Sequence, residues 1–105
     1  INRENKLTEA IDIYKMSKYK DTLVKNLSHG QQKRVSLMRT LILDSDIWIL
    51  DEPFSALDDE TKEILFETFV RAIKQNKAII VTGHSTIKHN LINVKNYLLE
   101  DGRIQ

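Results

Sequence analysis

The chain has 105 residues, enough for one domain or for part of one. Sixteen basic against fifteen acidic side chains leave a formal net charge of +1, which gives no electrostatic basis for binding nucleic acid or an anionic membrane. The absence of cysteine excludes disulfides and thiolate metal sites, and the apolar runs are too short to span a bilayer.

The first predicted element is a short amphipathic helix over residues 5–16. Its apolar side chains recur at helical spacing: Leu7, Ala10, Ile11 and Tyr14. A polar turn follows at 17–21, and the apolar residues of 22–27 are expected to hold a short element against the body of the protein. The N-terminal residues lack a signal-peptide pattern. Because the chain starts with Ile1 rather than Met, we expect that an upstream part was removed.

A second helix is predicted to start at Ser28, because Ser28 and Gln31 match the Ser-x-x-Gln capping box. An apolar stripe carries this helix to about residue 43: Val35, Met38, Leu41 and Ile42. Residues 44–46 end the pattern. The four large apolar residues 47–50 then predict a strand that is covered on both faces, as in a parallel sheet.

A long third helix is predicted after the turn that contains Pro53, with Asp58 or Asp59 as its cap and its end near residue 75. Acidic residues crowd its first turns, which suits the helix dipole.

The C-terminal part predicts a second buried strand at 78–82, followed by His84. A short helix is expected around 86–91, and residues 97–100 and 103–105 predict a small terminal hairpin. This order of elements predicts an α/β layered fold with parallel strands.

The strand 47–50 ends in the carboxylate pair Asp51 and Glu52. Such a strand end lies at the sheet edge where ligands bind in α/β folds. One carboxylate can hold Mg²⁺, directly or through water, while the other orients and deprotonates an attacking water. Acids at strand ends are also often only solvated, so the pair alone leaves both interpretations open.

Two further residues suit phosphate chemistry. The helix start at Ser28, with Gly30 permitting close approach, offers free N–H groups and the positive end of a dipole to an anion. A plain N-cap is the simpler interpretation. His84 can donate a hydrogen bond to a terminal phosphate, although a lone histidine beside a loop often has no such role. His29 and His89 lack partners at metal-ligand spacing and are predicted not to be ligands.

Together these features resemble the C-terminal half of an ABC-type ATPase domain. The resemblance covers nearly the whole chain and is carried, in this order, by LSHGQQKR, IWILDE, SALD and His84. LSHGQ is similar to the family signature LSGGQ, with His29 in place of the first glycine. The resemblance implies a P-loop NTPase-like parallel-sheet core that is incomplete. Residues 1–43 would end the helical subdomain and include the signature helix, and residues 44–105 would form half of the catalytic core.

The resemblance implies that the cofactors are ATP and Mg²⁺. Asp51 would be the Walker B residue that holds Mg²⁺, Glu52 the catalytic base, and His84 the switch histidine that contacts the γ-phosphate.

The other matched residues would act across a head-to-tail dimer with a second ABC ATPase subunit. Ser28, Gly30 and Gln31 would meet ATP held by the opposite subunit. Ser55 and Asp58 would belong to the D-loop, which crosses the dimer interface.

The implied function is that of the ATP-binding and ATP-hydrolysing subunit of an ABC transporter, cytoplasmic and held at the inner face of the membrane by a permease. The signature and Walker B runs are similar to those of the ATP-binding subunit of the haem exporter used in cytochrome c maturation. They are also similar to those of energy-coupling subunits of cobalt and vitamin uptake systems. No nucleic-acid partner is expected.

Two alternatives stay open. One is half of a non-transport ABC ATPase of chromosome maintenance or DNA repair, although no heptad run of coiled-coil length precedes Ser28. The other is a non-catalytic interaction fragment.

The Walker A loop, the adenine-stacking aromatic residue and the Q-loop of the family are expected upstream of residue 1, and this missing half is an implied partner. No glycine-rich lysine loop occurs in these 105 residues. Without its phosphate cradle, the chain alone is expected neither to bind ATP tightly nor to hydrolyse it. Loss of the Walker A strand would also leave 78–82 with an unpaired apolar edge, prone to aggregation or strand borrowing.

Overall fold

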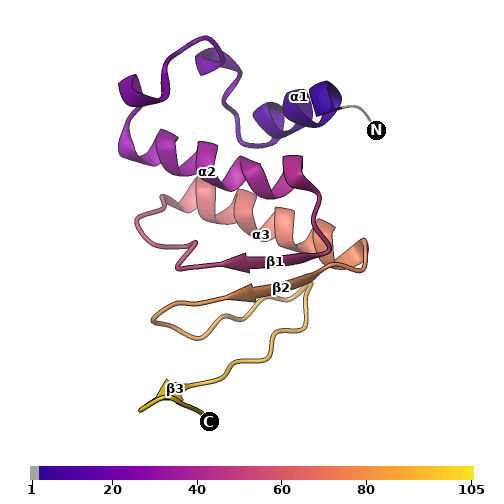
Figure 1. The fold of residues 1–105 in the computed structure, drawn as a ribbon, viewed down its shortest axis with the longest axis vertical. Coiled ribbons are helices and arrows are strands. Elements are labelled where there is room, and N and C mark those ends of the chain that lie inside the picture. Colours follow the sequence, from indigo (N-terminus) through magenta and orange to yellow (C-terminus); the bar gives the residue numbers. More distant parts are fainter. Residues whose placement is uncertain (1–2) are drawn as a thin grey trace.

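The computed structural model describes residues 3–105 and places the helices on one side of a two-stranded parallel sheet (Figure 1). The elements, in chain order, are helix α1 (Arg3–Ile13), the 3₁₀ turns Ser17–Tyr19 and Val24–Asn26, helix α2 (His29–Leu43), strand β1 (Ile47–Leu50), helix α3 (Asp59–Lys74), and strands β2 (Ala78–Val81), β3 (Leu99–Glu100) and β4 (Arg103–Ile104). Within these residues, no helix is both long enough and apolar enough to cross a membrane.

Strands β1 and β2 run parallel, with Leu50 opposite Val81 at their carboxyl ends. Both strands therefore end at one edge of the sheet, on the left in Figure 1. The predicted α/β class with parallel strands is confirmed. In residues 3–105 the two strands pair only with each other, so the outer edge of each is unpaired.

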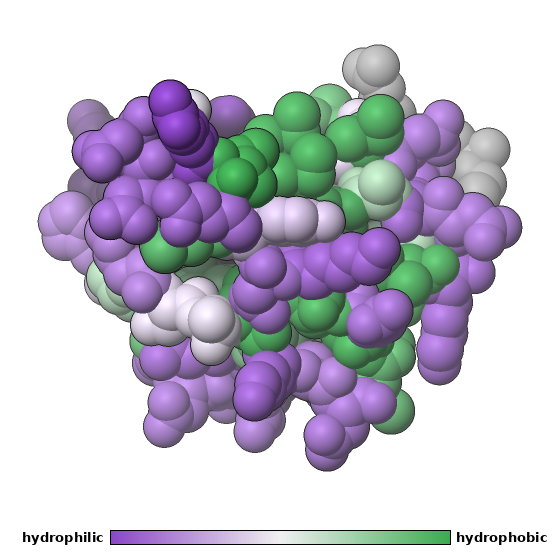
Figure 2. Space-filling view, turned by 90° about the horizontal axis from the view of Figure 1, so that it is seen from below, coloured by the Kyte–Doolittle hydropathy of each residue, from purple (hydrophilic) through white to green (hydrophobic). Residues whose placement is uncertain are grey.

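Only one face of this parallel pair is covered. Trp48 is 5% exposed beneath the helices, whereas its neighbours Ile47 and Ile49 are 61% and 74% exposed. On β2, Ile80 is likewise exposed. The predictions that 47–50 is covered on both faces and that 78–82 is a second buried strand are therefore wrong. Side chains alternate across a strand, and the described chain supplies a helical layer to one face alone. Figure 2 shows hydrophobic areas among the charged residues on the side seen from below.

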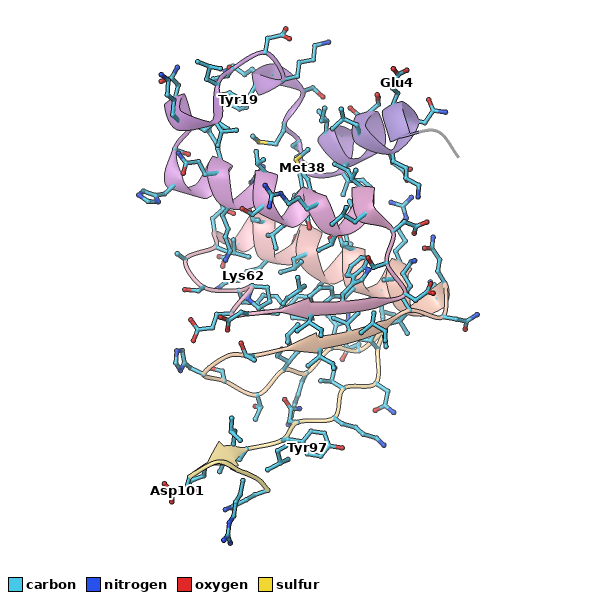
Figure 3. All side chains as sticks on the ribbon, viewed as in Figure 1. Glu4, Tyr19, Met38, Lys62, Tyr97 and Asp101 are labelled. Carbon is cyan, nitrogen blue, oxygen red and sulfur yellow. The ribbon has the colours of Figure 1, made fainter. Side chains whose placement is uncertain are left out.

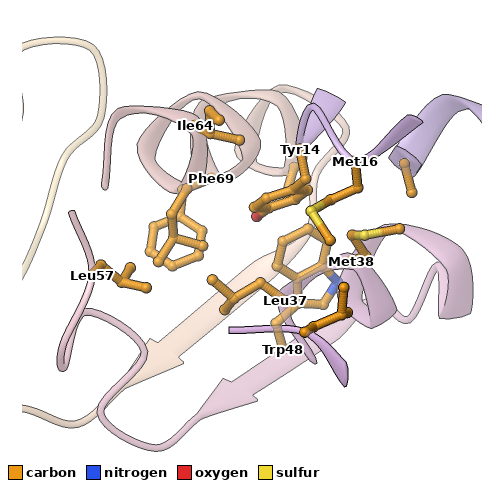
Figure 4. Packing of buried hydrophobic residues seen from close by; sticks show 12 residues of the cluster. Tyr14, Met16, Leu37, Met38, Trp48, Leu57, Ile64 and Phe69 are labelled. Carbon is orange, nitrogen blue, oxygen red and sulfur yellow. The ribbon is translucent and has the colours of Figure 1, made fainter. Parts of the chain in front are cut away.

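The core lies between α2, α3 and the covered face of the sheet (Figure 4). Tyr14, just after α1, has no exposed surface, and its hydroxyl lies 3.4 Å from the Thr68 hydroxyl of α3. Met38 points from α2 toward the N-terminal segment (Figure 3). The Trp48 indole N–H donates to the Ser45 carbonyl at 2.9 Å, so burial of this large ring leaves no polar atom unpaired.

The N-terminal helix differs from its predicted bounds of 5–16, because α1 ends at Ile13 and Lys15 takes a left-handed backbone conformation (φ 56°). Ala10 and Tyr14 are buried as predicted. The segment 22–27 is held less firmly than expected: its last residue, Leu27, is buried, but the other apolar side chains, Leu23 and Val24, are exposed.

The predicted helix around 86–91 is wrong, since these residues form an irregular loop with one isolated antiparallel bridge between His89 and Ile92. The Asn96 side chain accepts the N–H of Ile87 at 2.9 Å and donates to its carbonyl at 3.0 Å. His89 Nδ1 accepts the N–H of Leu91 at 3.2 Å. These side-chain bonds take backbone groups that a helix would need. The terminal hairpin is confirmed, with Leu99 opposite Ile104.

Candidate functional site

Four polar residues meet at the carboxyl edge of the parallel pair. Asp51 and Glu52 follow β1, and Thr82 and His84 follow β2. His84 Nε2 lies 2.7 Å from Glu52 Oε1. The Thr82 hydroxyl lies 2.6 Å from Asp51 Oδ1 and accepts the N–H of Glu52 at 3.0 Å. The fold therefore brings together three residues that the sequence singled out, Asp51, Glu52 and His84, and adds Thr82, which it did not.

The backbone at Glu52 turns sharply away from the strand. Its φ is 47°, in the left-handed region that a non-glycine residue seldom takes. The Glu52 carbonyl accepts the N–H of Ser55 at 3.1 Å and lies 3.5 Å from Lys33 Nζ of α2. The turn after β1 is thus held by a hydrogen bond within the turn and by a contact with the side chain of Lys33 on α2.

A cavity of about 420 Å³ opens beside this cluster. Glu52, Ser55 and His84 line it together with Lys62, which Figure 3 labels beside the loop that follows β1. Three basic or ionisable donors, Lys62, His84 and Lys88, thus share the cavity with one carboxylate, that of Glu52. Such a mixed lining suits a ligand that carries negative charge and a reactive water.

The start of α2 is the predicted capped helix N-terminus. Ser28 Oγ accepts the N–H of Gln31 at 3.2 Å, and Gln31 Oε1 accepts the N–H of Ser28 at 2.9 Å, so the capping box is confirmed. Ser28 and Gly30 are exposed, and space around Gly30 is open. No hydrogen bond or ion pair within residues 3–105 joins Ser28, Gly30 or Gln31 to the carboxylate cluster.

The turn between β1 and α3 ends at Asp58, which caps α3 by accepting the N–H of Thr61 at 2.8 Å. Hydrogen bonds from Thr61, with a smaller contribution from the positive charge of Arg34, hold the pKa of Asp58 below its usual value. Ser55 is exposed in the same turn, Ala56 has a left-handed φ of 59°, and Leu57 is buried. Buried Pro53 and Leu57 and the Asp58 cap therefore hold this turn, in which Ser55 and Asp58 are exposed.

Arg34 is a residue whose importance the sequence did not reveal. From α2 its guanidinium donates to the Tyr14 carbonyl at 3.0 Å, to Thr61 Oγ1 at 2.8 Å and to Glu60 Oε1 at 3.1 Å. Its side chain is 13% exposed, and Asp58 Oδ2 lies 3.7 Å away. Arg34 therefore ties the start of α2 to the end of α1 and to the start of α3.

The residues at the carboxyl edge fit a Mg²⁺ ion that is bound jointly by protein oxygens and by a phosphate. Residues 3–105 contain no group of three His, Asp or Glu side chains placed to hold a metal by themselves. Mg²⁺ commonly binds through one or two carboxylates together with water and substrate phosphates. Asp51 is exposed and uses one carboxylate oxygen for Thr82, which leaves the other for such a shared ion.

Comparison with known proteins identifies the family to which this chain belongs. The sequence model of the ABC transporter family matches residues 2–55, which include α1, α2, β1 and the carboxylate pair. This chain belongs to the ABC transporter family. The family model thus covers the capped start of α2 and Asp51–Glu52, two of the four features on which the resemblance rested.

Curated relatives of this chain are named as ATP-binding proteins of transport or export. It is 38% identical over 95 residues to a probable ABC transporter ATP-binding protein of Cyanophora paradoxa, covering 90% of this chain and 38% of that protein. It is 36% identical over 76 residues to a cytochrome c biogenesis ATP-binding export protein of Mannheimia succiniciproducens, covering 72% of this chain and 35% of that protein. The chain thus spans less than half the length of these relatives.

The fold also matches a solved structure of an ATP-binding cassette of an ABC transporter. The TM-score is 0.62 with 21% sequence identity, over 96% of this chain and 40% of the solved one. The arrangement of helices over a parallel pair is therefore the fold of part of such a cassette.

Proposed function

We propose that the complete protein is the ATP-binding and ATP-hydrolysing subunit of an ABC transporter. The observation that carries the proposal is the convergence of Asp51, Glu52 and His84 at one sheet edge, in a chain of this family. Names of relatives support the transport role, since they include a cytochrome c biogenesis export protein and a trimethylamine N-oxide transport protein.

In the chain's own site, Asp51 would hold Mg²⁺, and Glu52 accepts a proton from the attacking water. Mg²⁺, when bound, would neutralise charge on the β- and γ-phosphates of ATP. Glu52 is 43% exposed, so water reaches its carboxylate without a conformational change. His84, whose side chain is 89% exposed, presents its imidazole beside that carboxylate and donates toward the γ-phosphate.

The start of α2 serves a second ATP, held by another ABC ATPase subunit in a head-to-tail dimer. Ser28 and Gly30 are exposed and Gln31 is half-buried at this helix start, where the positive end of the dipole is turned outward. Within the described residues 3–105, no hydrogen bond or ion pair joins these residues to the carboxylate cluster, which supports a division into two sites. Ser55 and Asp58, in the turn beside the cavity, lie along the interface with the second subunit.

The polypeptide divides into 1–43, the end of a helical subdomain with the signature helix, and 44–105, half of the catalytic core. A segment carrying the Walker A loop completes the core. The exposed face of Ile47, Ile49 and Ile80 and the unpaired edges of β1 and β2 supply surface for it. The complete protein lies at the cytoplasmic face of the membrane, bound to a permease.

The test is phosphate release from ATP by the complete protein and by the 105-residue chain, each with and without Mg²⁺. The proposal predicts Mg²⁺-dependent hydrolysis by the complete protein. It predicts no hydrolysis by the chain alone, with calorimetric affinity for Mg-ATP weaker than micromolar, because the phosphate cradle is absent. A complete protein that releases no phosphate from ATP would overturn the proposed activity.

A further inference from the structure

Thr82 links the two carboxylate residues from the neighbouring strand. Its Oγ1 lies 2.6 Å from Asp51 Oδ1 and 3.0 Å from the backbone nitrogen of Glu52. A threonine hydroxyl has one proton to donate and lone pairs to accept with. It therefore donates to the Asp51 carboxylate and accepts the Glu52 N–H, so one short side chain contacts both residues.

The register of the sheet puts Thr82 in this place. Leu50 lies opposite Val81, and the Thr82 N–H donates to the Leu50 carbonyl at 3.0 Å. Thr82 is thus the first residue beyond the paired part of β2, on the side of Asp51. Because side chains alternate along a strand, a slip of one residue would turn the hydroxyl away from the carboxylate.

Glu52 depends on such support because of its left-handed backbone (φ 47°), which a glutamate adopts at a cost. Its carbonyl is held by the N–H of Ser55 at 3.1 Å. Its N–H is held by the Thr82 hydroxyl. With both backbone groups bonded, the side chain of Glu52 is directed to the cavity and to His84.

We propose that Thr82 is a positioning residue for the carboxylate pair: it orients Asp51 toward Mg²⁺ and holds Glu52 in the conformation from which it accepts a proton. This role rests on the proposed function, since orientation of the pair affects hydrolysis only if Asp51 and Glu52 act there. The bond to the Glu52 N–H, in contrast, is a property of the fold and is measurable without turnover.

The experiment compares Thr82→Val, which keeps the size but removes the hydroxyl, with Thr82→Ser, which keeps the hydroxyl, in the complete protein. Thr22→Val is the matched control, because Thr22 is exposed and its hydroxyl has no partner within residues 3–105. Thr82 is exposed, so Thr82→Val is expected to fold, and Thr82→Ala provides a second variant without the hydroxyl. The two readouts are hydrogen exchange of the Glu52 amide and the Mg²⁺ concentration that gives half-maximal ATP hydrolysis.

In Thr82→Val, the Glu52 amide is expected to exchange about tenfold faster, because its hydrogen bond to the hydroxyl is lost. The same variant is expected to need about tenfold more Mg²⁺, because the charge-assisted bond to the Asp51 carboxylate is lost. Thr82→Ser and Thr22→Val should match the unmodified protein in both. If Thr82→Val also matches it, or Thr82→Ser behaves like Thr82→Val, the inference is wrong. If exchange at Glu52 responds as expected but the unmodified protein hydrolyses no ATP, the proposed function fails, and the catalytic role of Thr82 fails with it.

Discussion

His84 Nε2 lies 2.7 Å from Glu52 Oε1, across the edge where β1 and β2 end. This is the only polar contact of the His84 side chain within residues 3–105. An exposed imidazole is thus held by the same carboxylate that we propose as the base. In this arrangement each side chain restricts the orientation of the other.

Replacing His84 in the complete protein tests this pairing. His84→Ala should lower kcat for ATP hydrolysis by about a hundredfold, a typical contribution of a positioned proton donor or acceptor, with ATP affinity nearly unchanged. His84→Gln, which keeps a donor of similar reach, should retain more activity. The measurement is steady-state phosphate release together with equilibrium ATP binding. Full turnover by His84→Ala would remove this histidine from the mechanism.

Arg34 is predicted to stabilise the fold by joining α1, α2 and α3. Arg34→Met should lower the free energy of unfolding by about 2 kcal/mol, because it leaves the Tyr14 carbonyl and the Thr61 hydroxyl without their charged donor. Arg39→Met is the matched control on the same helix, since Arg39 is exposed and makes no polar side-chain contact within residues 3–105. Denaturant unfolding of both variants measures the difference. Equal stabilities would show that the Arg34 contacts do not hold the helices together.

The ion pairs of Asp44 should make the stability of the folded protein depend on pH. Hydrogen bonds and ion pairs with Lys6 and Lys77 lower the pKa of Asp44 from 3.8 to about 2. Since the folded-state value is the lower one, ionised Asp44 stabilises the fold above pH 3.8, and this stabilisation is lost as the pH falls toward 2.

Asp44→Asn should therefore lower the Tm at neutral pH, with a difference from the unmodified protein that shrinks as the pH falls through this window. Asp46→Asn is the control, because the exposed Asp46 side chain has no partner within residues 3–105. Thermal unfolding at several pH values gives the comparison. A Tm difference that stayed constant down to the lowest pH would argue against the ion pairs as its origin.

Ser28 allows its capping role to be separated from its proposed role toward phosphate. Aspartate and asparagine cap helices about as well as serine, so Ser28→Asp and Ser28→Asn should both preserve α2. Ser28→Asp, however, places a negative charge where the second subunit's ATP would lie. It should prevent ATP-dependent dimerisation of the complete protein, whereas Ser28→Asn should weaken it far less. Sedimentation velocity with Mg-ATP measures this, and ATP-dependent dimers of Ser28→Asp would contradict the trans role of Ser28.

Features determined by neighbouring residues were predictable from the sequence. The start of α2 follows from the four-residue capping box at Ser28, and the cap of α3 at Asp58 follows from the same local chemistry. The strand at 47–50 was recognised from a continuous apolar run, and the two carboxylates were recognised because they follow that run directly.

Features determined by distant residues were not. The contact of Thr82 with Asp51 depends on strand register, and the contacts of Arg34 depend on how three helices meet. The apolar run at 47–50 suggested cover on both faces, because composition alone does not say which layers a chain supplies. The predicted helix at 86–91 failed because Asn96, well beyond it, binds the backbone of Ile87.

The most direct test of the proposed activity is ATP binding and turnover by Glu52→Gln in the complete protein, beside Glu63→Gln. Glu63 is an exposed acid on α3 that makes no polar side-chain contact within residues 3–105. Glu52→Gln should bind ATP as the unmodified protein does but release phosphate about a thousandfold more slowly, whereas Glu63→Gln should be unchanged in both. Undiminished phosphate release by Glu52→Gln would contradict the assignment of Glu52 as the base.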